Sequence, residues 1–384
     1  MAVYSIVFII PFLAALSPQQ FSKNLSNYLW KLYLISLFLF IGTRYQVGGD
    51  WLNFLHFFYV DSKNFDMFNF ATVRSEYGYE FLCYIIYNLG LPFYFINFIA
   101  AIIFLYGLNE FAKRQPDKWL VFMMATTFLI IVVSMGYTRQ SIGLGFLLIA
   151  LNQFFDGKKL FPIILIIIGS SFHLSCIFFL TIFLLDFRLS YKNLLVWFLL
   201  FIISLFILVY VNENISRLIK YYYTEGDDAK KIINQSRGAI VRISINAIAA
   251  LIFLFNYKKL SNNLLERKFY IYISILVISS LFLVKTNSTL VDRVNIYFMP
   301  IQFLVFTRLI YLYSEINKSF LIFFTGCIYY LMLWGWLIYG TYSYIWLPYN
   351  SLILPHTSKY TCNDHEEYWV WENLKIDSDI LCKY

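Results

Sequence analysis

Continuous runs of apolar residues, joined by short polar connections, make up most of the sequence. Residues 195–211, 269–284 and 320–338 are examples, and such runs approach or reach the roughly 17–25 residues that a helix needs to cross a bilayer. A transmembrane β-barrel would instead show short segments in which apolar and polar residues alternate. The pattern therefore predicts an all-α, polytopic integral membrane protein.

We expect about 11–12 transmembrane helices, which form a single transmembrane domain over residues 1–384. Residues 2–16 are apolar but have no positive charge before them, which favours a first span over a removed signal peptide. A broken or re-entrant helix pair is expected near 160–186, because small residues and His173 interrupt that run. Segment 79–90 is expected to be an interfacial helix. The other predicted spans are 29–43, 92–111, 119–135, 141–155, 193–211, 239–256, 269–285, 294–312 and 320–338.

The basic residues of the connecting loops predict the orientation, because Lys and Arg are enriched in cytoplasmic loops. These loops fall on one side only if 160–186 crosses the membrane twice, since a single crossing would place the basic loop 258–268 outside. Both termini then face outward. The external regions are the loops 43–78 and 212–238 and the polar C-terminal tail 339–384.

The composition supports this class, because 60% of the residues are hydrophobic and only 14% are charged, whereas soluble domains carry about 25% charged residues. A soluble enzyme, a disordered chain and a fibrous repeat are excluded. The formal net charge of +8 is explained by the cytoplasmic loops, and no basic block or RNA-binding motif indicates a nucleic-acid partner. Cys362 and Cys382 can pair if the tail is external and are ordinary thiols if it is cytoplasmic.

Charged residues in or near membrane spans are candidates for function, because each costs roughly 2.5–3.5 kcal/mol to insert. Arg44 lies at the outer end of the second span. Gly48 and Gly49 allow a sharp turn that brings Asp50 back near it. The functional interpretation is an anion-binding arginine held by a carboxylate, and the alternative is an interfacial arginine beside a turn.

Two further candidates precede and follow the fifth predicted span. Arg139 and Gln140 occupy a short outer connection, where an arginine runs against the positive-inside bias, although a lipid headgroup contact would also explain it. His173 lies deep in an apolar run at the expected helix break, and irregular backbone at membrane depth is tolerated mainly beside cavities. It is either a satisfied core histidine or a general base.

A fourth group of candidates lies toward the C-terminal half of the chain. Asp292 and Arg293 stand at the entry to a span, where they form a surface ion pair or orient the guanidinium toward a cavity. Arg237 and Arg242 flank the entry to the span at 239–256 and are further candidates. Tyr297 follows Arg293 on the same segment.

Several outward-facing arginines with one histidine and few carboxylates suggest binding of a polyanion. The guanidinium group gives bidentate hydrogen bonds to phosphate and stays ionised. A lipid-linked pyrophosphate at the outer membrane face fits, because its isoprenoid tail would lie among the spans and arginine would stabilise the leaving pyrophosphate. No DxD-like pair lies beside the outer arginines, so the sequence implies no metal and no other cofactor.

These motifs, in this order on a scaffold of many spans, resemble the EpsG-like, Wzy-type polymerases of bacterial O-antigen, capsule and exopolysaccharide. The resemblance covers most of the chain. It rests on Arg44 with Val-Gly-Gly-Asp at 47–50, Glu-Tyr-Gly-Tyr at 76–79, Arg139-Gln140, Phe-His-Leu-Ser at 172–175, and Asp292-Arg293 followed by Tyr297. Trp51 and Phe54 stand where the family often shows Tyr after the Asp.

The resemblance implies a metal-independent glycosyltransferase that acts at the periplasmic face of the bacterial inner (cytoplasmic) membrane. It would transfer a growing glycan from undecaprenyl pyrophosphate to a new lipid-linked repeat unit, in lipopolysaccharide or other polysaccharide biosynthesis. A chain-length regulator protein is an expected partner besides the lipid substrate and the bilayer. Arg44, Arg139 and Arg293 would engage pyrophosphate, His173 would help to activate the acceptor hydroxyl, and Asp50 and Asp292 would orient arginines. Gln140, Tyr297, Arg237 and Arg242 are expected to contribute to substrate binding.

Other functions use similar residues. An O-antigen ligase takes the same donor but usually carries a larger external loop than 212–238. A lipid-linked oligosaccharide flippase or other transporter should show repeated halves and charges at mid-membrane. A membrane acyltransferase also needs His and Arg, but typically with a cytoplasmic donor site. Loss of the gene product separates these alternatives, because single-repeat surface chains favour a polymerase and a missing surface glycan favours a ligase or flippase.

Overall fold

The computed structural model describes residues 1–17, 23–66, 76–185, 236, 238–285, 288–312 and 315–353. These residues form helices and no β-strand, apart from one isolated β-bridge between Arg44 and Ser351. The predicted all-α membrane class is confirmed. Six of the helices that the structure describes are long and apolar enough to cross a membrane: Asn24–Gly42, Tyr94–Lys113, Lys118–Gly136, Ala239–Leu260, Val291–Leu312 and Asn317–Tyr339.

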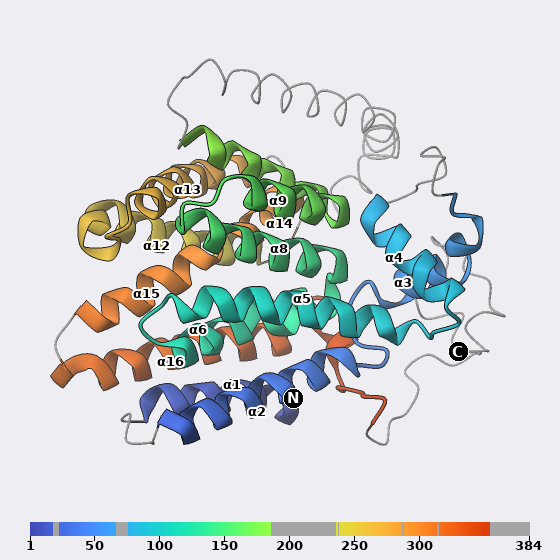
Figure 1. The fold of residues 1–384 in the computed structure, drawn as a ribbon. Helices are drawn as coiled ribbons and strands as arrows, with labels where there is room; N and C mark the ends of the chain where they lie inside the picture. Colours follow the sequence, from blue (N-terminus) through green and yellow to red (C-terminus); the bar gives the residue numbers. More distant parts are fainter. Residues whose placement is uncertain are drawn as a thin grey trace, which may run out of the picture. The chain divides into compact units, whose positions relative to one another are not determined.

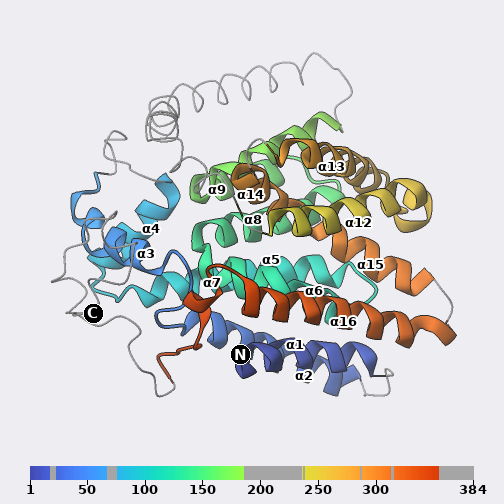
Figure 2. The same ribbon diagram turned by 180° about the vertical axis from the view of Figure 1, so that it is seen from behind.

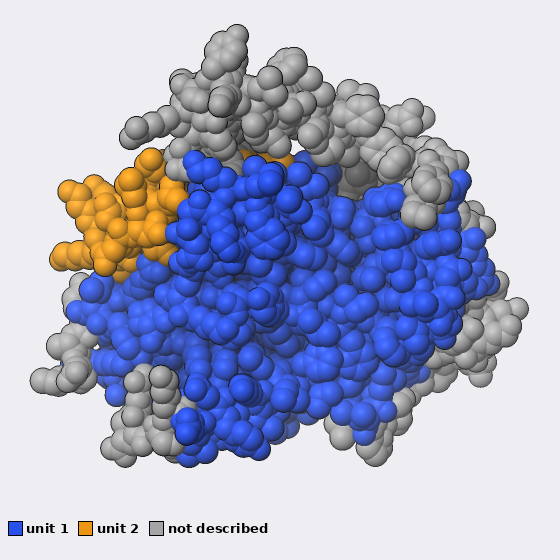
Figure 3. All heavy atoms as spheres, viewed as in Figure 1, with its two compact units in different colours: residues 1–177, 303–384 blue, residues 178–302 orange. Residues whose placement is uncertain are grey.

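The chain divides into two compact units, which Figure 3 shows in different colours. Unit 1 comprises Met1–Ile177 and Phe303–Tyr384, and unit 2 comprises Phe178–Gln302. The single transmembrane domain over residues 1–384 stays a prediction. The predicted span 193–211, most of the loop 212–238 and the tail beyond residue 353 lie outside the described residues.

Unit 1 is a bundle of apolar helices (Figure 1). The contacts between α5 and α8 are the most extensive, and α8 also packs against α9. The segment 118–136 is buried almost throughout, and its middle is a π-helix. The helices of unit 1 are α1 (Ala2–Leu16), α2 (Lys23–Gly42), α5 (Tyr94–Lys113), α6 (Lys118–Ala125), π-helix η3 (Thr126–Val133), α7 (Ser134–Gly136), α8 (Thr138–Phe155), α9 (Leu160–Phe172), most of α15 (Pro300–Leu312) and α16 (Glu315–Tyr339).

Glycines allow α5 and α8 to approach closely. A Cβ atom on Gly145 of α8 would lie 2.7 Å from the carbonyl oxygen of Ile103, and a Cβ atom on Gly107 of α5 would meet the backbone of Gly145. Small residues at such contacts let helix backbones pack tightly within a membrane. This contact fixes the position of α8 relative to α5. The first turn of α8 carries the candidate Arg139.

A small cap of short helices lies at the end of the unit-1 bundle where α5 begins (Figures 1 and 2). It consists of α3 (Trp51–Tyr59), the 3-10 helix η1 (Asp61–Asn64) and α4 (Tyr77–Asn88). An aromatic core holds it together, in which Trp51, Phe54, Phe58 and Tyr79 are buried. The helix predicted at 79–90 is present as α4, which begins and ends two residues earlier, and its location at the membrane interface stays a prediction.

The predicted break near His173 is confirmed. Helix α9 ends at Phe172, His173 takes an extended conformation, and the 3-10 helix η4 (Leu174–Leu185) follows. The Gly-Ser-Ser sequence before the break explains it in part, because Ser170 and Ser171 hydroxyls bond to the carbonyl oxygens of Ile166 and Ile168 and compete with the helical pattern.

Unit 2 contains α12 (Ala239–Leu260), α13 (Leu264–Leu283) and α14 (Ser288–Phe298), which pack on one another. Buried amides link them. Asn246 donates from Nδ2 to the carbonyl oxygen of Asn295 at 3.0 Å and accepts a hydrogen bond from Gln302 at 2.6 Å, and Asn295 donates to the Ser280 hydroxyl at 3.0 Å. Polar groups buried in an apolar unit must be hydrogen-bonded, so this network specifies how the three helices pack.

The α5–α8 contact generates a stability prediction. Gly145→Ala places a methyl group against backbone that cannot move away, and overpacking of this kind costs about 1–3 kcal/mol. Gly335→Ala on α16 is the matched control, because nothing lies within 4 Å of its added Cβ. We expect Gly145→Ala to lower the melting temperature of the detergent-purified protein by several degrees and Gly335→Ala to leave it unchanged or raise it. Equal melting temperatures would contradict the packing.

Candidate functional site

The loop after α2 is held in place on two sides. On one side, Tyr45 N–H donates to Asn350 O at 3.0 Å and Leu352 N–H donates to Thr43 O at 2.8 Å. On the other, Gly48 adopts φ +109° with its α-carbon against the carbonyl oxygen of Met135. A side chain at this glycine would both strain the backbone and collide with the chain before α8.

Arg44, the first candidate, is buried inside this loop with 1% of its surface exposed. Its Nη1 donates to Ile41 O at 2.9 Å, and its Nη2 donates to the Thr138 hydroxyl at 2.9 Å. The Nε atom has no hydrogen-bond partner in the described part of the chain, where no carboxylate forms an ion pair with Arg44 either. The guanidinium therefore lies at the carboxyl end of α2, where the helix dipole favours a cation.

Burial lowers the pKa of Arg44 to about 10, and the nearby hydroxyls of Tyr79 and Tyr349 act in the opposite direction. The side chain therefore remains charged at neutral pH. A buried cation without an acidic partner raises the electrostatic potential of the groups around it, because the surrounding protein screens charge less than water does.

Arg139 is the second arginine of the site and lies in the first turn of α8, next to Thr138. Its side chain is 29% exposed, forms an ion pair with Glu76, and lies over the ring of Phe54 with 5.6 Å between Cζ and the ring centroid. Asp50 also interacts with it electrostatically. The turn of the 46–50 loop was predicted to bring Asp50 near Arg44, which stays a prediction, and the structure adds that the charge of Asp50 acts on Arg139.

Glu76 is a site residue to which sequence reasoning assigned no role. It is the N-cap position of α4, and its side chain is 22% exposed. The only signal in the sequence is its place at the head of the Glu-Tyr-Gly-Tyr motif at 76–79. The sequence around a single acidic residue in a loop does not indicate which basic residue it contacts. The ion pair with Arg139 is therefore visible only in the folded structure.

His173 lies on a segment that contacts the start of α4. A Cβ atom on Gly78 would meet the hydroxyl and backbone of Ser171, two residues before His173. The ring of Phe172 packs against the aromatic core of the cap. His173 itself is half-buried. The N-terminus of α4, which carries Glu76, and the C-terminus of α9, which precedes His173, are therefore neighbours.

The segment after α16 folds back over the same end of unit 1. Trp346 donates from its indole to Ile131 O at 2.9 Å, and a Cβ atom on Gly136 would collide with its ring. Tyr349 stacks on Phe40 and donates to its carbonyl oxygen at 2.8 Å. Residues 343–353, hereafter the strap, thus pack against the Arg44 loop. These residues were predicted from the sequence to belong to a polar tail.

The remaining candidates, apart from Gln140, belong to unit 2. Arg242 binds Asp292 through both Nε, at 2.9 Å from Oδ1, and Nη2, and Ser236 donates to the same carboxylate at 2.7 Å. Arg293 is exposed, whereas Tyr297 is buried beside Phe179. Asp292 therefore holds Arg242 and the start of α12. Arg237 lies outside the described residues, and Gln140 of unit 1 is buried.

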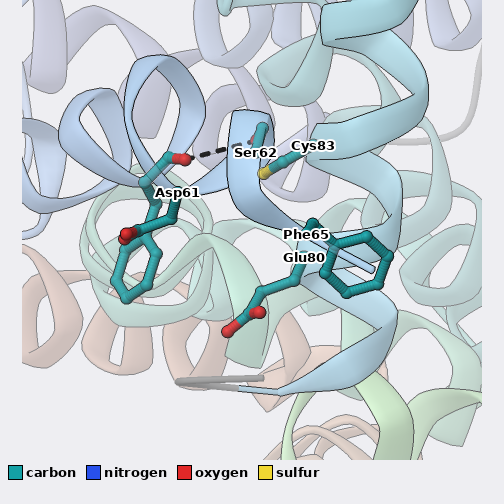
Figure 4. A pocket seen from close by; sticks show the side chains of 6 residues that line it. Asp61, Ser62, Phe65, Glu80 and Cys83 are labelled. Carbon is teal, nitrogen blue, oxygen red and sulfur yellow. Dashed lines mark hydrogen bonds between the residues drawn. The ribbon is translucent and has the colours of Figure 1, made fainter. Parts of the chain in front are cut away.

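A small cavity lies within the cap, between η1 and α4 (Figure 4). Its lining includes Asp61, Phe65, Glu80 and Cys83, and the Ser62 hydroxyl donates to Phe57 O at 3.2 Å. No group of three or more His, Cys, Asp or Glu side chains within the described ranges is arranged to hold a metal ion.

Fold and site together define a polytopic membrane protein with a cationic site of two arginines at one end of its helix bundle. The sequence profile of the EpsG family matches residues 27–351. The chain therefore belongs to the EpsG family, and it is a polysaccharide polymerase-like membrane protein, glycosyltransferase-like in its chemistry. No curated protein matches the chain, and neither does any solved structure.

The loop geometry predicts different outcomes for two adjacent glycines. Gly48→Ala should displace the Arg44 loop, because its Cβ meets the backbone of Met135 at a φ that favours glycine. Gly49→Ala is the control, since its nearest neighbour would be the Trp346 ring at 3.6 Å. In a deletion strain of the host, we expect the first variant to lose most of the wild-type length of surface polysaccharide and the second to retain it. Identical polysaccharide from both would contradict the role of this loop.

Proposed function

We propose that this protein is an O-antigen or exopolysaccharide polymerase of the bacterial inner membrane. It moves a growing glycan from undecaprenyl pyrophosphate to a new lipid-linked repeat unit at the periplasmic face. The observation that carries the proposal is the pair of neighbouring arginines at the start of α8. Arg139 is partly exposed, and the buried guanidinium of Arg44 donates a hydrogen bond to Thr138, the residue before Arg139. Membership of the EpsG family supports the reaction class.

The two arginines have different parts in this proposal. Arg139 reaches the surface and provides the planar donor fork that suits a phosphate group. Arg44 is 1% exposed, so it acts through its charge rather than through contact. The N-terminus of α8 adds its partial positive charge at the same point. Together they stabilise the negative charge that develops on the diphosphate as it leaves.

The transfer breaks one bond and forms another. An acceptor hydroxyl oxygen attacks the anomeric carbon of the donor sugar, and the bond from that carbon to the diphosphate oxygen breaks, so the electron pair leaves with undecaprenyl pyrophosphate. The hydroxyl proton passes to a base, and the half-buried His173 is the residue that we propose for it. The neighbouring ends of α4 and α9 support this assignment.

Unit 2 supplies the other residues of the proposal. Arg293 is exposed on α14, next to the Asp292 carboxylate that Arg242 holds. We propose that Arg293 contacts a pyrophosphate of one of the two lipid-linked substrates. That it shares a pocket with Arg44 and Arg139 stays a prediction, as do a partner that regulates chain length and the outward orientation of the site.

Arg139 is the most direct target for mutation. Arg139→Ala should abolish polymer and leave single-repeat chains, because removing one preorganised donor for the leaving group costs about 100- to 1000-fold in rate. Arg139→Lys should retain only partial activity, since an ammonium group lacks the fork. The matched control is Arg114→Ala, which removes a pair with Asp156 beyond the other end of α8. The readout is a glycan gel from complemented deletion strains with equal membrane protein levels. A full-length ladder from Arg139→Ala would contradict the proposal.

His173 should affect turnover more than binding. His173→Gln keeps hydrogen-bonding capacity but cannot accept the proton, so we expect a fall in rate of about 100- to 10,000-fold with little change in affinity for the lipid donor. The measurement is a purified assay with separate rate and binding experiments. Parallel losses of rate and affinity would assign His173 to binding or structure instead.

A further inference from the structure

The charges around Arg139 are mixed, which a site for a diphosphate alone does not explain. Glu76 forms an ion pair with Arg139, and Asp50 also acts on its guanidinium. Arg44, in contrast, has no acidic partner within the described part of the chain. Two carboxylates therefore act on Arg139, while the neighbouring Thr138 binds a buried arginine that forms no ion pair with an acid of the described residues.

A diphosphate would be repelled by carboxylates within a few ångströms, because like charges in a partly buried site are weakly screened. Two acids beside the anion-binding arginine would weaken the binding of a substrate that was only an anion. The proposed substrate, however, carries a sugar with its hydroxyl groups directly on its diphosphate. Carboxylates are strong acceptors for hydroxyl groups, and the mixed charges match the two halves of such a molecule.

We propose that Glu76 is a specificity-determining residue that accepts hydrogen bonds from hydroxyl groups of the sugar next to the diphosphate. Asp50, whose charge also acts on Arg139, is the second acceptor in this proposal. Arg139 pairs with Glu76 and follows Thr138, the residue that binds Arg44, in the first turn of α8. The Glu76 side chain is 22% exposed and is held by both its place at the start of α4 and its ion pair. This inference rests on the proposed function, because it assumes a lipid-linked pyrophosphate donor.

The test compares two lipids that differ only in the sugar. One is undecaprenyl pyrophosphate that carries the repeat unit, purified from a host strain without this protein, and the other is undecaprenyl pyrophosphate alone. Glu76→Gln retains the shape of the side chain and an oxygen for Arg139. We expect it to weaken binding of the glycosylated lipid to the purified full-length protein by about tenfold or more, with binding of the bare lipid unchanged or tighter, because a carboxylate that repels the diphosphate is removed. Glu110→Gln is the control, since it removes an acid that pairs with Lys113 in the last turn of α5.

Asp50→Asn provides a second variant in case Glu76→Gln fails to fold, and the same selective loss is expected. Equal losses for both lipids would overturn the inference, because Glu76 would then only position Arg139. Tighter binding of both lipids by Glu76→Gln would also overturn it, since the carboxylate would then only repel the diphosphate and accept no hydrogen bond from the sugar. If the wild-type protein binds neither lipid, the proposed function itself fails, which is a result distinct from the other two.

Discussion

The buried guanidinium of Arg44 is the constraint on which the rest of this site depends. A charged side chain inserted near hydrocarbon costs roughly 2.5–3.5 kcal/mol, and no acid of the described residues forms an ion pair that offsets the charge. Its stabilisation comes from the carbonyl oxygen of Ile41 at the end of α2 and from the hydroxyl of Thr138. Both acceptors must be held accurately, because each contributes only if its geometry is kept.

Distant parts of the chain hold those acceptors in place. The strap pairs with the backbone on both sides of Arg44, and the tight turn at Gly48 packs on the chain that leads into α8. The cap completes the arrangement, since Phe54 supports the guanidinium of Arg139 and the N-terminus of α4 supplies Glu76. A site assembled from segments near residues 44, 76, 138 and 350 requires most of unit 1 to be folded.

Features that depend on local sequence were predictable. Continuous apolar runs determine where the helices lie, and the small residues before His173 indicate the break between α9 and η4. The sequence also singled out both Arg44 and Arg139, because charged residues at the ends of spans stand out against an apolar background. Their proximity was a hypothesis, which the bond from Arg44 to the Thr138 hydroxyl supports.

Features that depend on long-range pairing were not predictable from one sequence. Asp50 was expected at Arg44, since the two share a loop, and nothing in the sequence indicated that its charge acts on Arg139. Asp292 was expected to orient its neighbour Arg293 but binds Arg242. The strap looked like the start of a polar tail, because Trp346 and Tyr349 bind residues that are far away in the sequence, Ile131 and Phe40. A hydrophobic pattern indicates which residues are buried but not which residues they contact.

The most direct test of the central claim is an experimental structure of the purified protein with its lipid-linked repeat unit bound. We expect the diphosphate to lie within hydrogen-bonding distance of the Arg139 guanidinium, on the side of Thr138, with Arg44 still buried behind it. A diphosphate bound away from Arg139, or at the end of the bundle where α5 meets α6, would contradict the account.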